Sequence, residues 1–94
     1  MGVVGSLREQ ENTIKQKFGV QRIGVFGSFA RGEETDKSDI DVLVDFVPGK
    51  KTFDNFMDLK YFLEELFGRK VDLVTVQALR PQIKEGILQD VIYA

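Results

Sequence analysis

The chain contains no cysteine and no histidine. Without cysteine it has no disulfide and no thiol nucleophile, and the absence of both residue types removes the usual ligands of zinc. Any bound metal ion must therefore be held by oxygen atoms, which favours magnesium or manganese. The missing histidine also removes the most common general base of enzymes.

A strong charge of one sign and long apolar runs are also missing. Thirteen basic and fifteen acidic residues give a net charge of −2, so no basic field is available to hold long nucleic acid by its phosphates. No apolar run approaches the roughly 20 residues that span a membrane, and the N-terminus lacks the apolar block of a signal peptide. We therefore expect no long nucleic acid and no membrane among the partners, and a cytoplasmic location.

The 94 residues, 43% of them hydrophobic, suffice for one core, so we expect one domain over residues 1–94. Apolar periodicity and turn residues predict six elements. They are a helix over 7–18 that starts at a Ser6–Glu9 capping box, strands over 22–26 and 39–47, a helix over 53–67, a strand over 71–76 and a helix that starts at Pro81 and carries Leu88, Val91 and Ile92. A short helical turn is expected within residues 29–34. This order predicts an α/β (α+β) fold, a small mixed three-stranded sheet flanked by helices.

Two sets of apolar residues are candidates for packing in the core. The phenylalanines of the third helical segment are interpreted as core and helix packing: Phe53, Phe56, Phe62 and Phe67. The apolar face of Leu88, Val91 and Ile92 fits either a core or an interface, because periodicity does not distinguish the two.

Two aspartates two residues apart carry the strongest chemical signal. Asp39 and Asp41 leave the same face of a strand with about 6 to 7 Å between their Cα atoms. Two like charges crowded into one volume are unfavourable unless a cation or a donor offsets them, which favours a divalent metal site. Asp72 supplies a third ligand if its strand lies parallel to the strand over 39–47. We prefer it to Asp45, which lies further along the same face.

The dipeptide Gly27-Ser28 follows the first strand directly. Glycine lets the backbone approach a phosphate closely, and the next amide and hydroxyl can donate to its oxygens. This turn meets Asp39 and Asp41 only if the first two strands run antiparallel. The sequence contains neither a Walker loop nor a G-x-G-x-x-G fingerprint, so the phosphate site is of a different design.

Arg31 has two interpretations. Its guanidinium can pair with a phosphate, or it can bridge at the surface to one of the nearby acids, Glu33, Glu34 or Asp36. The nearby lysines are interpreted as solvated charges: Lys37, Lys50 and Lys51. Arg31 is therefore the one basic residue that we include among the candidate nucleotide contacts.

The run Gly-Ser-Phe-Ala-Arg-Gly at 27–32, followed by Ser-Asp-Ile-Asp-Val at 38–42, resembles the signature of the polymerase-β-like nucleotidyltransferase superfamily, in particular its minimal nucleotidyltransferase family. The resemblance covers nearly the whole chain. It implies the fold of that superfamily, two magnesium ions held by three carboxylates, and a triphosphate held at the Gly-Ser turn. Carried over, the metal ligands and catalytic residues are Asp39, Asp41 and Asp72, and the nucleotide contacts are Gly27 and Ser28.

The same resemblance implies a function. Some members of the family are antitoxins that adenylylate a tyrosine of a HEPN ribonuclease toxin. We therefore expect a metal-dependent nucleotidyltransferase that moves AMP from ATP to a hydroxyl of a partner protein and releases pyrophosphate. Two alternatives stay open, a non-catalytic module that masks the toxin and a homodimeric nucleotidyltransferase acting on an antibiotic-like small molecule. The acceptor, the base preference, the number of nucleotides transferred and the oligomeric state also stay open.

Overall fold

The computed structural model describes residues 2–94. Its elements in chain order are α1 (Val3–Phe18), β1 (Val20–Phe26), α2 (Gly27–Arg31), β2 (Ile40–Phe46), α3 (Phe53–Phe67), β3 (Val71–Thr75), the 3-10 turn η1 (Val76–Ala78), α4 (Pro81–Asp90) and β4 (Ile92–Tyr93). The strands form one sheet in the order β3-β2-β1-β4. β1 runs antiparallel to β2 and β4, whereas β2 and β3 run parallel. The predicted mixed sheet is confirmed.

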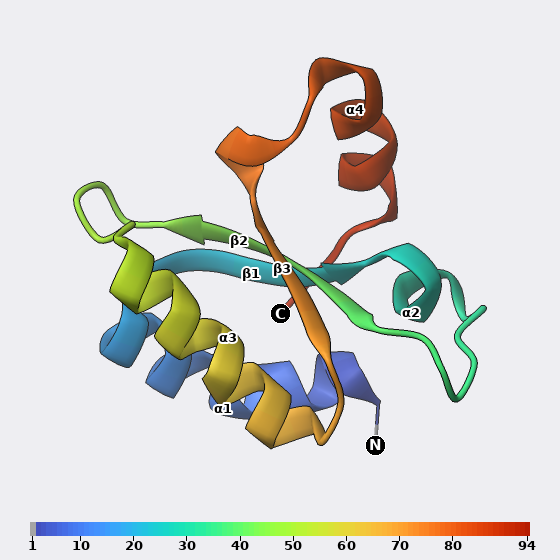
Figure 1. The fold of residues 1–94 in the computed structure, drawn as a ribbon, viewed down its shortest axis with the longest axis horizontal. Coiled ribbons are helices and arrows are strands. Elements are labelled where there is room, and N and C mark those ends of the chain that lie inside the picture. Colours follow the sequence, from blue (N-terminus) through green and yellow to red (C-terminus); the bar gives the residue numbers. More distant parts are fainter. Residues whose placement is uncertain (1) are drawn as a thin grey trace.

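The two faces of the sheet are covered differently. α1 and α3 lie side by side against one face, and α4 stands on the other (Figure 1). α3 is the crossover that joins the parallel strands β2 and β3, as a parallel pair requires. The fully buried side chains between the two helices and the sheet are Leu7, Ile14, Val25, Val42, Val44, Leu59 and Leu63. This core packs against one side of β2, while the other side carries Asp41 and Asp45 around the buried Leu43.

The start of α1 differs from the prediction. The helix begins at Val3, its N-cap is Gly2, and no side chain caps it. The Ser6 amide donates to the Gly2 carbonyl at 3.1 Å, so Ser6 lies inside the helix and the predicted capping box is wrong. Val3 and Val4 pack against the core, and this packing extends the helix beyond the local signal.

Within residues 2–94 no helix is long and apolar enough to cross a membrane.

α3 matches its predicted bounds at both ends. The Thr52 side chain accepts a hydrogen bond from the Asn55 amide at 3.1 Å, and Gly68 ends the helix with a φ of 64°. One prediction for this helix is wrong, because Phe53 is 78% exposed. The other three phenylalanines pack against the core as expected: Phe56, Phe62 and Phe67.

The C-terminal segment also departs from the prediction. α4 ends at Asp90 and Val91 is already extended, with φ −64° and ψ 136°. Ile92 and Tyr93 then pair with β1 as a fourth strand, so the sheet has four strands where three were expected. Val91 and Ile92 do have helical spacing, but pairing of Ile92 and Tyr93 with the free edge of β1 stabilises the chain more than a further turn of helix would.

Candidate active site

Two of the three predicted carboxylates lie side by side. Asp41 of β2 and Asp72 of β3 are direct partners in the parallel register. Partner residues of neighbouring strands project from the same face of a sheet, so both carboxylates lie on the face away from α1 and α3. The parallel arrangement of β2 and β3, which the sequence prediction needed for Asp72 to be reached, is confirmed.

The third carboxylate lies at the entrance to this pair. Asp39 is exposed and precedes β2 by one residue. The pKa of Asp41 is raised above its ordinary value of 3.8, first because burial disfavours its charged form and then because Asp72 and Asp39 repel it. The nearby charge of Arg31 acts in the opposite direction and lowers this pKa. The three acids therefore share one negative field, which a bound cation would relieve.

Gly27 lies directly against Asp41. Phe26 pairs with Asp41 across the antiparallel strands, and the chain turns into α2 at Gly27 with a φ of 71°. A Cβ atom at Gly27 would lie 2.2 Å from Asp41 Oδ2. Only glycine satisfies both the backbone conformation and this close approach. The predicted meeting of the Gly27-Ser28 turn with β2 is confirmed.

Arg31 forms two ion pairs. Its Nε donates to Glu33 Oε1 at 2.6 Å, and its Nη1 donates to Asp90 Oδ2 at 3.0 Å. The pair with Glu33 is one of the surface bridges considered from the sequence. The pair with Asp90 was missed, because Asp90 is 59 residues away in the chain and no local pattern signals such a contact. Arg31 thus connects α2 to α4 beside the acidic face.

Asp45 has a local role that distinguishes it from the other acids. Its Oδ1 accepts a hydrogen bond from Gln77 Nε2 of η1 at 3.3 Å. Asp45 faces the same side as Asp41 but lies four residues further along β2, and its neighbour in the sheet is not an acid. The register therefore supports the choice of Asp72 over Asp45 as the partner of Asp41.

The donor set suits a cation that is bound together with phosphate. Within residues 2–94 no three acidic side chains converge closely enough to hold a metal ion by themselves. Magnesium normally takes one or two carboxylates and completes its shell with water and substrate phosphates, so a closed protein cage is not required. Asp41 and Asp72 offer such a pair of oxygen ligands, with Asp39 at its edge and a glycine-lined approach at Gly27. The residues present therefore fit a nucleotide-bound magnesium ion.

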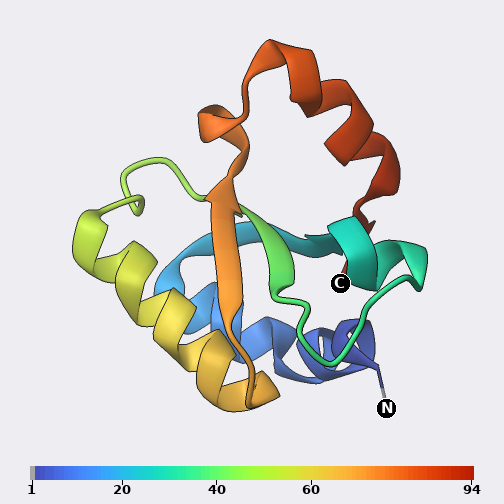
Figure 2. The ribbon, with the colours of Figure 1, turned by 45° about the vertical axis from the view of Figure 1, so that its right-hand side comes forward.

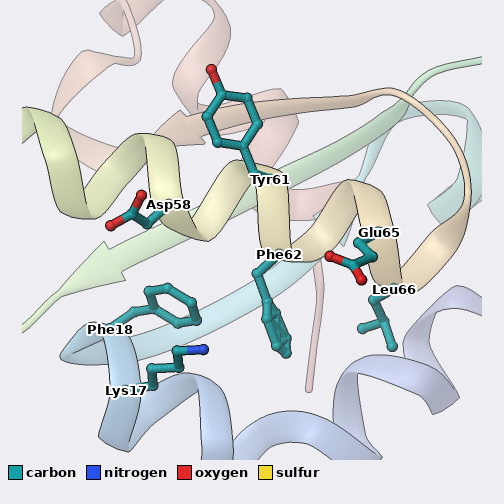
Figure 3. Close-up of a pocket in the computed structure, with 7 residues that line it drawn as sticks. All are labelled: Lys17, Phe18, Asp58, Tyr61, Phe62, Glu65 and Leu66. Carbon is teal, nitrogen blue, oxygen red and sulfur yellow. The ribbon is translucent and has the colours of Figure 1, made fainter.

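A pocket of about 690 Å³ lies elsewhere. It opens between the end of α1 and the outer side of α3, on the helical side of the sheet (Figure 3). Its lining combines aromatic and charged side chains: Lys17, Phe18, Asp58, Tyr61, Phe62, Glu65 and Leu66. The pocket lies on the opposite side of the sheet from Asp41 and Asp72. The candidate site is therefore identified by these carboxylates and Gly27, and not by the size of a pocket.

Comparison with known proteins identifies the family of the chain. The model of the nucleotidyltransferase domain family matches residues 7–94. Protein adenylyltransferase MntA of Thermococcus cleftensis is 40% identical over 87 residues, which cover 93% of this chain and 87% of that protein. A candidate protein adenylyltransferase of Methanocaldococcus jannaschii is 44% identical over 88 residues, covering 93% of this chain and 89% of the relative.

Solved structures show the same fold. The structure of a candidate minimal nucleotidyltransferase superposes with a TM-score of 0.79 at 37% identity and covers 98% of this chain and 95% of its own. A toxin-antitoxin complex crystallised with AMP-PNP has a TM-score of 0.72 at 20% identity and covers 90% of this chain and 69% of that one. At that lower identity the likeness concerns the fold alone.

Proposed function

The chain belongs to the nucleotidyltransferase domain family, and from that premise we propose that it transfers AMP from ATP to a hydroxyl group of a partner protein. One observation carries the proposal: Asp41 and Asp72 face each other in register, with Gly27 packed against the Asp41 carboxylate. The names of the relatives add the protein acceptor, since those relatives are called protein adenylyltransferases.

Each site residue has a proposed role. Asp39, Asp41 and Asp72 would hold two magnesium or manganese ions together with the phosphates of the substrate, and Gly27 and Ser28 would contact the triphosphate. Arg31 is placed to meet a phosphate only if it leaves Glu33 or Asp90, both of which are at the surface. The metal ions, when bound, lower the pKa of the acceptor hydroxyl and offset charge on the leaving pyrophosphate.

Residues of the chain position the reacting groups and accept the proton of the acceptor hydroxyl. The acceptor oxygen forms a bond to the α-phosphorus of ATP, and the bond from that phosphorus to the pyrophosphate oxygen breaks. The proton of the acceptor hydroxyl passes to an Asp72 carboxylate oxygen, because the sequence has no histidine to take it and Asp72 is the exposed acid of the in-register pair. Gly27 keeps the Asp41 carboxylate in place without a side chain between them.

The acceptor is proposed to be a tyrosine of a HEPN ribonuclease toxin, so that the chain acts as an antitoxin. This step depends on the resemblance of the 27–32 and 38–42 motifs to the antitoxin-type minimal nucleotidyltransferases. Its support is that a solved toxin-antitoxin complex contains a chain with this fold. A labelling reaction distinguishes transfer to the toxin from binding alone.

The test is a labelling reaction. The purified chain is incubated with magnesium, labelled ATP and the product of the neighbouring reading frame, and the label is located by mass spectrometry. We expect label on a tyrosine of that product with wild type and none with Asp41→Asn. The matched control is Asp45→Asn, which removes an acid of the same strand and face that bonds only to Gln77, and it should retain transfer.

Other outcomes would redirect the assignment. A tight complex with no label for wild type would contradict transfer and favour a masking module. Label on an added aminoglycoside, and none on protein, would favour the small-molecule alternative. Normal transfer by Asp41→Asn would contradict the site itself.

A further inference from the structure

β3 is an edge strand whose outer side has no partner strand. It lies at the end of the sheet with β2 as its single neighbour, and it is seen at the front of Figure 2. The Ile40 amide donates to the Lys70 carbonyl at 3.0 Å. In a parallel pair alternate residues bond to the neighbour, so Lys70, Asp72 and Val74 face β2 and the residues between them face outward.

The two ends of this outer edge differ. The outward amide of Val71 already donates to Glu64 Oε2 at 3.1 Å. Among the described residues, no bond outside the sheet ladder is found for the outward backbone groups of Leu73 and Thr75. An edge strand with unpaired amides and carbonyls is a template for another extended chain. The unpaired part of the edge is therefore the half that begins next to Asp72. Leu73 and Thr75 are 7% and 3% exposed, so a further strand must reach them through the pocket that they line.

An apolar pocket runs along the same half of the strand. It has a volume of about 450 Å³ and lies between β3, the start of α3 and η1. Its lining residues are Lys51, Thr52, Phe53, Phe56, Leu73, Val74, Thr75 and Ala78. Phe53 is the most exposed large apolar side chain among the described residues, at 78%. Exposed apolar surface beside an unpaired edge indicates a binding site for a peptide segment.

We propose that the edge of β3 binds an extended segment of the acceptor protein as an additional strand, with an apolar side chain of that segment in the Phe53 pocket. The inference rests on the proposed function and specifies how its acceptor is presented. Backbone groups of Leu73 and Thr75 supply the pairing, which requires an extended polypeptide and excludes a small-molecule occupant.

This arrangement places the acceptor beside the proposed proton acceptor. A strand added to β3 lies about 4.8 Å away, and a residue opposite Asp72 on the acidic face has its Cβ about 5 Å from that of Asp72. A tyrosine, serine or threonine there extends its hydroxyl along the acidic face toward Asp41. The pocket includes Phe53 and Phe56 of α3 and so lies towards the helical face, and it takes a side chain an odd number of residues away, opposite Leu73 or Thr75, about 3 or 10 Å further along the strand. Docking thus fixes the register of the acceptor against the carboxylates.

The first experiment separates docking from chemistry through steady-state labelling. Phe53→Ser should raise the KM for the product of the neighbouring reading frame about tenfold, the effect of losing roughly 1.4 kcal/mol of contact, and leave kcat and the affinity for ATP unchanged. The matched control is Tyr61→Ser, which removes an aromatic of the same helix that is 57% exposed and lies in the other pocket. An unchanged KM for Phe53→Ser, or an equal rise for Tyr61→Ser, would refute the docking site.

The second experiment needs no turnover. Hydrogen exchange is followed residue by residue on the chain with and without the same product. The Leu73 and Thr75 amides should become protected in the complex, whereas the Val71 amide, already bonded to Glu64, should change little. Binding without protection of these two amides overturns the proposal even if transfer occurs. Protection that appears without the partner and grows with protein concentration assigns the edge to a second copy of this chain instead. Absence of label with protection intact contradicts the transfer function alone.

Discussion

Gly27→Ala provides a sharp test of the site geometry. Gly27 has a φ of 71°, and an added Cβ would lie 2.2 Å from Asp41 Oδ2. The left-handed backbone alone costs a residue with a Cβ about 1–2 kcal/mol. Moving the Asp41 carboxylate about 30° away from its rotamer adds about 0.5–1.5 kcal/mol. We therefore expect Gly27→Ala to lower the free energy of unfolding by about 1.5–3.5 kcal/mol.

Gly68→Ala is the matched control for this measurement. Gly68 has a φ of 64° and nothing within 4 Å of the position of a Cβ, so this change contains the backbone cost without the contact. Urea unfolding, read as the midpoint at constant slope, compares the two variants directly. The excess cost of Gly27→Ala should disappear in an Asp41→Ala background, where the carboxylate is absent.

Two results would refute the reasoning. If Gly27→Ala costs no more than Gly68→Ala, the carboxylate of Asp41 does not lie against Gly27 in solution. If the excess persists without the Asp41 carboxylate, the strain has another source. Transfer activity supplies an independent check, because Gly27→Ala should lose activity through the displaced carboxylate whereas Gly68→Ala, whose added Cβ meets nothing within 4 Å, should keep it.

Three further predictions follow from contacts of the same fold. Asp41→Asn should stabilise the metal-free protein near pH 7 but not near pH 3, as measured by urea unfolding at both pH values. The raised pKa of Asp41 means that the folded state binds its proton more tightly, so stability falls as pH rises from the ordinary value of 3.8 through the raised one. EDTA should abolish transfer, and magnesium or manganese should restore it, with an unchanged circular dichroism spectrum; activity that survives exhaustive chelation would contradict the metal site. Thr52→Ala should cost about 1 kcal/mol in thermal or urea unfolding, because Thr52 accepts the Asn55 amide at 3.1 Å, and an unchanged stability would show that water replaces this cap at no cost.

The features that could be predicted from the sequence have local causes. The bounds of α3 follow from a capping threonine, a helical apolar stripe and a terminal glycine, all within one continuous segment. The mixed sheet followed from the need for the Gly27 turn, Asp41 and Asp72 to meet, and the registers of β1, β2 and β3 agree with it. The roles of these residues remain predictions.

The features that could not be predicted depend on contacts distant in the sequence. The start of α1 is set by packing of Val3 and Val4, which outweighs the capping signal at Ser6. β4 forms because β1 has a free edge for Ile92 and Tyr93. Periodicity also predicted the wrong environment for Phe53. A helical apolar stripe does not show where the helix extends beyond the sheet that it packs on, and Phe53, in the first turn of α3, is exposed.

The division of the sheet into two faces explains why an acidic site is compatible with so small a fold. The helix pair α1 and α3 supplies the core on one face, so stability does not require the other face to be apolar. On that other face, burial and the repulsion by Asp72 and Asp39 raise the pKa of Asp41, which costs free energy in the metal-free protein. A bound cation would offset this cost, whereas Asp41→Asn removes it permanently. A gain in stability together with a loss of transfer in that one variant would therefore show that the carboxylate which destabilises the metal-free fold is the one that the reaction needs.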